Sequence, residues 1–196
     1  MNPKILHPEV QNFINNHLKS EITKLILKGS PFDAIPIQEL ANQIIAKQKS
    51  ERKLPTWFST KNIYYPPKIS IEQTSSEITA KYKSSIVSGN SIIDITGGFG
   101  IDCYYFSKLF TTVTHCEINE DLSTIVKHNY KQLEIKNIQT FAGNGFNYLK
   151  ETKQLRPQQL SVSDTHENIS SLKTLDPTLT KDALKIINQH YEQLHI

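Results

Sequence analysis

The stretch that decides the fold is SIIDITGGFGID, residues 91–102. It begins with a short β-branched run, residues 91–95, and continues into three of the chain's seven glycines, Gly97, Gly98 and Gly100. A glycine-rich turn directly after a strand allows backbone angles that other residues rarely adopt, and it lets the backbone approach a ligand closely. The stretch therefore predicts a strand, a ligand-binding loop and the start of a helix.

The elements alternate in type downstream of this loop. Residues 101–110 and 119–133 have the apolar spacing of helices, whereas residues 112–117 and 137–142 are short runs typical of strands. Strands and helices that alternate with short connections form a parallel sheet covered by helices. We predict an α/β fold with a Rossmann-like parallel sheet, the first half of a doubly wound domain.

A helical part precedes the sheet. Apolar residues recur at helical spacing over residues 8–28, where Gly29 is a stop signal, and again over residues 37–45. We expect these helices to form a small N-terminal helical module, residues 1–53, with their apolar stripes in its core.

Residues 54–70 are expected to form a connector. Pro66-Pro67 excludes a helix at that point, so we interpret the segment as extended. Its aromatic side chains could stack on bases, but packing against the next domain is the simpler interpretation. These side chains are Trp57, Phe58, Tyr64 and Tyr65.

Two ligand classes use a glycine loop at this position. A nicotinamide or flavin dinucleotide places its pyrophosphate at the helix N-terminus, whereas S-adenosylmethionine brings a cationic amino-acid end and a sulfonium to the same turn. Asp94 ends the strand and Asp102 follows the loop, and two carboxylates would repel a pyrophosphate. Their charges favour S-adenosylmethionine, with a dinucleotide-dependent oxidoreductase as the weaker alternative.

Two further residues follow strands in the same way. Glu117 ends the second predicted strand, where an acidic side chain can accept hydrogen bonds from both ribose hydroxyls of either ligand class. The alternative is an acid favoured by a helix N-terminus, although Asn119 is the better cap. Asn144 follows the third strand and can face an adenine edge, or it belongs to an ordinary Asn-Gly turn.

These residues resemble the class I S-adenosylmethionine-dependent methyltransferases. In that family the Asp-x-Thr-Gly-Gly-x-Gly loop, which includes Thr96 here, is motif I; the acidic residue after strand two binds ribose, and the residue after strand three meets adenine. Residues 71–83 resemble the helix that the family places over the methionine end of the cofactor. The resemblance implies that Gln73, Thr79 and Lys83 are candidates to bind the cofactor carboxylate.

A bacterial subgroup shows a closer resemblance. Lys-Leu-Pro-Thr-Trp57, the Pro-Pro connector and the run ending in Glu77 are similar to bacterial RNA methyltransferases that carry a THUMP-like domain near the C-terminus. This resemblance implies methyl transfer from S-adenosyl-L-methionine to RNA (tRNA or rRNA) in the cytoplasm. We therefore expect residues 71–150 to form the cofactor-binding, Rossmann-like half, an incomplete methyltransferase core.

The sequence departs from this family after the third strand. The family's strand-four motif, similar to Asp-Pro-Ala-Arg, is missing, and no catalytic residue is identifiable. We expect residues 151–196 to form a polar tail with a C-terminal helix, over 180–194, that starts near Asp176-Pro177. The chain thus resembles a methyltransferase truncated after strand three, and the alternative function is a catalytically inactive protein that at most binds the cofactor or a partner.

A sheet of three strands would leave the strand before the glycine loop as an exposed edge, which favours aggregation. We expect a partner chain, a second copy of this chain, or residues 150–196 to cover this edge.

Composition excludes several other classes. Of the 196 residues, 37% are hydrophobic, which argues against wholesale disorder, and no apolar run is long enough to span a membrane. Two cysteines and scattered histidines predict no metal site and no disulfide framework. The net charge of +3 is small, so we interpret the lysine-rich run Lys47–Lys53 as a solvated surface.

Overall fold

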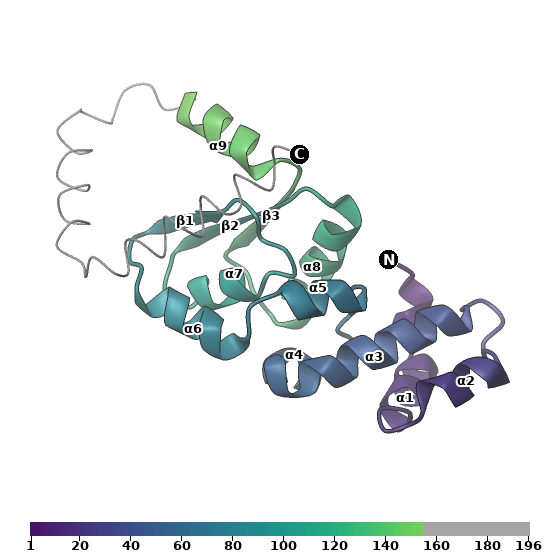
Figure 1. The fold of residues 1–196 in the computed structure, drawn as a ribbon. Coiled ribbons are helices and arrows are strands. Elements are labelled where there is room, and N and C mark those ends of the chain that lie inside the picture. The colour runs from purple at the N-terminus through teal and green to yellow at the C-terminus, as the bar shows by residue number, and fades with distance from the viewer. Residues whose placement is uncertain (155–196) are drawn as a thin grey trace, which may run out of the picture. The chain divides into compact units, whose positions relative to one another are not determined.

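A computed structural model describes residues 1–154 of the chain (Figure 1). The chain divides into two units, Met1–Leu149 and Lys150–Ile196. The predicted tail, including Asp176-Pro177, lies almost entirely outside the described residues. The elements are η1 (Pro3–Leu6), α1 (Pro8–Asn16), α2 (Ile22–Lys28), α3 (Ile37–Lys53), α4 (Pro55–Ser59), α5 (Lys68–Gln73), α6 (Glu77–Ser85), β1 (Ser91–Asp94), α7 (Ile101–Phe106), β2 (Thr112–Glu117), α8 (Glu120–Gln132), β3 (Ile138–Ala142) and α9 (Gly145–Gln154).

The sheet is parallel and has the order β1-β2-β3. Both crossovers, through α7 and α8, step in the same direction across the sheet. Since such crossovers are right-handed, both helices cover the same face, as Figure 1 shows. The α/β fold and its Rossmann-like sheet are therefore as predicted.

The two faces of β2 carry different side chains. Val113 is fully buried in the core beneath α7 and α8, and the fully buried His115 shares that face. Cys116 lies on the opposite face, where the α9 backbone begins at Gly145. Helix α9, which the sequence patterns did not indicate, also places Tyr148 against Phe141 of β3, with ring centroids 4.6 Å apart.

The predicted helix over residues 8–28 is wrong, because the structure has two helices, α1 and α2, separated by a turn. Asn15, Asn16 and His17 have low helix propensity at the point where α1 ends. The Ser20 N–H then donates to the His17 carbonyl oxygen (3.0 Å), which closes the turn.

The prediction that the connector is extended is also wrong in part, because residues 54–70 contain helix α4. Pro55 starts this helix at the first position, where the missing N–H leaves no hydrogen bond unmade. The prediction that the aromatic residues pack on the next domain is confirmed for Trp57, whereas Phe58 lies beside Lys47 of α3. Trp57 is fully buried, and its ring lies 4.9 Å from that of Tyr104 and 6.3 Å from that of Phe99, within the glycine loop.

A buried carboxylate joins α4 to α6 and α7. Glu77, at the start of α6, accepts hydrogen bonds from the N–H of Thr56 (2.6 Å) and from its hydroxyl (2.7 Å). The Tyr105 hydroxyl of α7 donates a third (2.8 Å). Three donors satisfy a carboxylate that is only 7% exposed, so this contact fixes the connector against the helices that flank the glycine loop.

Strand β1 is an edge of the sheet among the described residues. Helix α6 and its C-cap carry three exposed apolar side chains at helical spacing: Ile78 is 82% exposed, Tyr82 55% and Ile86 54%. The expectation that a further chain or segment covers the β1 edge stays a prediction. No helix within residues 1–154 is long and apolar enough to cross a membrane.

We predict that Trp57→Ala lowers the free energy of unfolding by about 3–5 kcal/mol, because it empties a buried site between the connector and the glycine loop. Urea denaturation of the two proteins measures the loss. Leu27→Ala is the control: Leu27 is 81% exposed, so its truncation should change the free energy of unfolding by less than about 0.5 kcal/mol. A loss for Trp57→Ala as small as that of the control would contradict the packing described above.

Candidate cofactor site

The glycine loop connects the end of β1 to α7. Gly98 and Gly100 adopt positive φ angles of 53° and 82°, a left-handed backbone that favours glycine. The Gly97 N–H donates to the Cys116 carbonyl oxygen of β2 (2.8 Å), so the loop continues the contact between the first two strands.

Two buried aromatic side chains hold the loop carbonyls. The His115 Nε2 lies 3.1 Å from the Gly98 oxygen, and since a carbonyl only accepts, the proton is on Nε2. The Tyr130 hydroxyl of α8 donates to the Gly100 oxygen (2.9 Å). The two rings meet edge to face at 5.9 Å between centroids. Burial raises the pKa of Tyr130, which keeps its hydroxyl protonated as a donor.

The same two side chains explain why the loop needs glycine. A Cβ at Gly97 would overlap the His115 ring, and a Cβ at Gly100 would overlap the Tyr130 hydroxyl. Sequence reasoning missed both contacts. The available signal was a histidine in the middle of the strand that follows the glycine loop, whose glycines permit close approach.

Asp94 lies at the end of β1, as predicted. Its Oδ1 accepts from the N–H of Thr96 (3.0 Å), and its Oδ2 is 3.7 Å from the Cys103 Sγ of α7. Burial raises the pKa of the Asp94 carboxyl, and the nearby charge of Asp102 raises it further. Asp94 and Asp102 thus bring two carboxylates to the loop, and Lys83 pairs with the second of them.

Glu117 ties the end of β2 to the loop. Its Oε2 accepts from the Gly98 N–H (3.0 Å), and its Oε1 accepts from the Asn119 N–H (2.8 Å). The Asn119 Oδ1 accepts a hydrogen bond from the Leu122 N–H (3.0 Å) and so caps α8. The helix therefore does not need the Glu117 carboxylate as its cap. A carboxylate oxygen accepts more than one hydrogen bond, and Glu117 thus keeps capacity for a ligand.

A cluster of three side chains lies where α6 meets α7. The Lys83 Nζ is 2.8 Å from Asp102 Oδ2 and 2.9 Å from the Ser75 hydroxyl, which in turn donates to the same Oδ2 (3.0 Å). Asp102 Oδ1 is buried and has no hydrogen-bond partner among the described residues. An unpartnered carboxylate oxygen beside the loop is an acceptor for a cationic donor. Ser75 was not among the predicted residues.

The remaining predicted residues lie at the margins of this group. Gln73, the last residue of α5, and Thr79, in the first turn of α6, are exposed. No hydrogen bond between described residues joins either of them to the loop. The Asn144 Oδ1 accepts from the N–H groups of Phe146 (3.0 Å) and Asn147 (3.1 Å). That oxygen caps α9, so the amide nitrogen of Asn144 is the group that can donate a hydrogen bond to a ligand.

We predict that Gly100→Ala destabilises the fold by about 2–5 kcal/mol, because a left-handed backbone angle and an overlap with Tyr130 add together. Gly98→Ala is the control. Gly98 also has a positive φ, of 53°, but the nearest atom to its Cβ position is the Thr96 oxygen at 3.9 Å, an ordinary contact, so only the backbone cost of about 1–2 kcal/mol applies. Equal losses in urea denaturation would contradict the close approach of Tyr130.

Comparison with known proteins agrees with this geometry. No protein-family model and no curated protein matches the sequence. A candidate methyltransferase from Porphyromonas gingivalis has a TM-score of 0.64 and 26% identity over 80% of this chain and 39% of its own. An rRNA methylase from Streptococcus thermophilus is less similar (TM-score 0.29, 17% identity, 33% of this chain and 39% of its own). So is a candidate methyltransferase from Streptococcus mutans, solved in complex with S-adenosylhomocysteine (TM-score 0.29, 28% identity, 33% and 37%).

The chain spans less than half the length of the Porphyromonas protein. Over 80% of this chain, the two proteins share a similar backbone arrangement. The resemblance inferred from the sequence is thus confirmed for the fold, and the chain has the fold of the class I S-adenosylmethionine-dependent methyltransferases.

Proposed function

We propose that the chain binds S-adenosyl-L-methionine at the glycine loop and takes part in methyl transfer to RNA. The observation that carries the cofactor assignment is the negative charge around the loop. The charge of Asp102 contributes to the raised pKa of Asp94, and Asp102 Oδ1 has no hydrogen-bond partner among the described residues. This environment suits an ammonium and opposes a pyrophosphate, so it favours the cationic cofactor over a dinucleotide.

Each end of the cofactor has a residue that fits it. Asp94 and the free oxygen of Asp102 accept from the ammonium, and Lys83 offers an ammonium of its own to the cofactor carboxylate. The Lys83 side chain is 42% exposed, and Asp102 is its single carboxylate partner among residues 1–154, so it can bind a second carboxylate without leaving the first. Glu117, anchored by Gly98, accepts from the ribose hydroxyls.

Other residues complete the proposed site. Gln73 and Thr79 supply further polar groups toward the cofactor carboxylate, and the Asn144 amide nitrogen donates to the adenine edge. Gly97, Gly98 and Gly100 form the loop itself, with Thr96 at its start. These residues bind and orient; the bound cofactor supplies the activated methyl group. A protein that aligns donor and acceptor accelerates transfer mainly by positioning.

RNA is the proposed acceptor. The subgroup that the connector and the run ending in Glu77 resemble acts on RNA, and this resemblance supports the assignment. Transfer of tritium from methyl-labelled S-adenosylmethionine to total RNA distinguishes an active enzyme from a protein that only binds the cofactor. Label in RNA supports the proposal, and its absence from RNA despite cofactor binding favours the binding-only alternative.

We predict that S-adenosylhomocysteine binds the purified chain with micromolar affinity, about −8 kcal/mol, and that NAD does not bind. Asp94→Asn should weaken this binding at least tenfold, since it removes a charge-assisted hydrogen bond from a site that stays the same size. Calorimetric titration measures both proteins. Asp121→Asn is the control because that side chain is 90% exposed, and its affinity should match wild type. An unchanged affinity for Asp94→Asn would refute the cofactor assignment.

The same titration has a defined dependence on pH. Burial raises the pKa of Asp94 above the value of about 3.9 for a free aspartate, so it gains a proton at a higher pH than exposed carboxyls do. Protonation removes the charge that faces the cofactor ammonium. The wild-type affinity should therefore fall as the pH is lowered toward this pKa, and Asp94→Asn should lack this component.

A further inference from the structure

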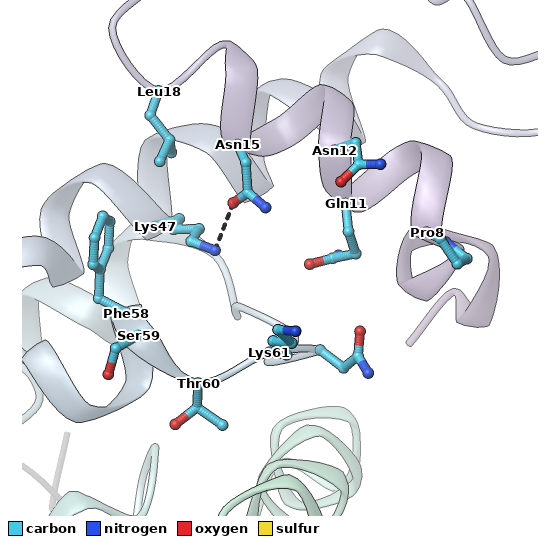
Figure 2. A pocket seen from close by; sticks show the side chains of 11 residues that line it. Pro8, Gln11, Asn12, Asn15, Leu18, Lys47, Phe58, Ser59, Thr60 and Lys61 are labelled. Atoms are coloured by element: carbon cyan, nitrogen blue, oxygen red, sulfur yellow. Dashed lines mark hydrogen bonds between the residues drawn. The ribbon is translucent and has the colours of Figure 1, made fainter.

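A polar cavity lies between α1, α3 and the segment that follows α4 (Figure 2). Its volume of about 540 Å³ is within the range of about 300–1,000 Å³ for small-molecule sites. None of the glycine-loop residues contributes to it, so it is separate from the proposed cofactor site. Its lining consists of Pro8, Gln11, Asn12, Asn15, Leu18, Lys47, Phe58, Ser59, Thr60, Lys61 and Asn62.

Lys47 is the unusual residue of this cavity. Only 9% of it is exposed, so the prediction of a solvated lysine run is wrong at this residue. Its Nζ donates to Asn15 Oδ1 (2.8 Å) and lies 5.6 Å from the centroid of the Phe58 ring. No carboxylate among the described residues pairs with it, and burial lowers its pKa. An ammonium has three donors, so this buried charge would be stabilised by an anion.

The other lining residues specify more than an anion. Gln11 donates its amide nitrogen to the Ile5 oxygen (2.8 Å), and Figure 2 shows its oxygen directed toward the cavity. Further amides and hydroxyls come from Asn12, Asn62, Ser59 and Thr60, and Lys61 adds a second cation. No acidic residue is among the described residues that line the cavity. A ligand that uses this set carries negative charge, donors and acceptors, and a flat surface for the Phe58 ring.

We infer that this cavity binds a phosphate-bearing nucleotide of an RNA strand. The phosphate meets Lys47 and Lys61, while the amides and the Phe58 ring contact the base. Exposed residues at the rim, including Asn12 and Asn62, leave room for the strand to continue on either side. This inference rests on the proposed RNA acceptor and adds the surface that holds it.

The cavity and the glycine loop share helix α4. Trp57 packs on Phe99 of the loop, whereas the next residue, Phe58, lines the cavity. An RNA strand bound in the cavity is therefore held by the same helix that packs on the cofactor loop. The N-terminal helices thereby acquire a role in selecting the acceptor.

The test is fluorescence anisotropy with a labelled single-stranded RNA 12-mer of mixed sequence and the full chain. Lys47→Met and Lys61→Met should each weaken binding by about tenfold, since a charge-assisted contact to phosphate is lost. Each should also reduce the slope of log K against log salt concentration by about 0.7. Lys127→Met, an exposed lysine on α8, is the control and should leave the slope nearly unchanged.

Separate readouts distinguish the possible failures. Neither cavity variant should lower the unfolding midpoint, and both should keep the wild-type affinity for S-adenosylhomocysteine, which supports a loss specific to RNA. Equal RNA binding by wild type and both variants would overturn the inference and leave the RNA acceptor standing. Failure of the wild type to bind RNA would overturn both, while the cofactor titration still stands. A third outcome is that Lys47→Met weakens the binding of free AMP but not of RNA. This outcome would assign the cavity to a free nucleotide and overturn the inference that it binds an RNA strand.

Discussion

Two hydrogen bonds donated to the carbonyls of the glycine loop are the contacts on which the candidate site depends. His115 holds the Gly98 oxygen and Tyr130 holds the Gly100 oxygen, both from buried positions. A buried carbonyl left unpaired is unfavourable by about 1–3 kcal/mol, so these donors fix the loop backbone. With the carbonyls fixed in this way, the Gly98 N–H meets Glu117, and Asp94 and Asp102 stay on either side of the loop.

The helices that precede the sheet also stabilise the position of the loop. Trp57 packs on the loop from α4, and Glu77 joins α4 to α6 and α7 through three hydrogen bonds. One hydrophobic core runs through the N-terminal helices and the covered face of the sheet. The cavity around Lys47 lies on the other side of α4, which suggests a division of roles: the loop binds the cofactor, and the helical part binds the acceptor.

The sequence pattern predicted those elements that depend on residues close together in the chain. The strands β1, β2 and β3 and the glycine loop follow from β-branched runs and glycine spacing, and their bounds agree within one residue. The sequence could not reveal the Tyr130 contact, which joins residues 30 positions apart, or the burial of Lys47, because packing across α1 and α4 decides it. Helix α4 was missed because Pro66-Pro67 led to an extended interpretation of the whole segment, whereas Pro55 starts a helix. The positions of Asp94, Gly98 and Glu117 were predictable because each follows or ends a strand.

The central claim is that the glycine loop holds the cofactor. Its most direct test is NMR of a glycine-labelled chain, because few glycines give few signals. A chain labelled with ¹⁵N-glycine gives seven backbone amide signals, and these are followed by NMR during titration with S-adenosylhomocysteine. The account predicts that the signals of Gly97, Gly98 and Gly100 shift together in a saturable manner, while Gly29, in the N-terminal helical part, does not move. Saturable binding that leaves the three loop signals unchanged would contradict the claim that this loop holds the cofactor.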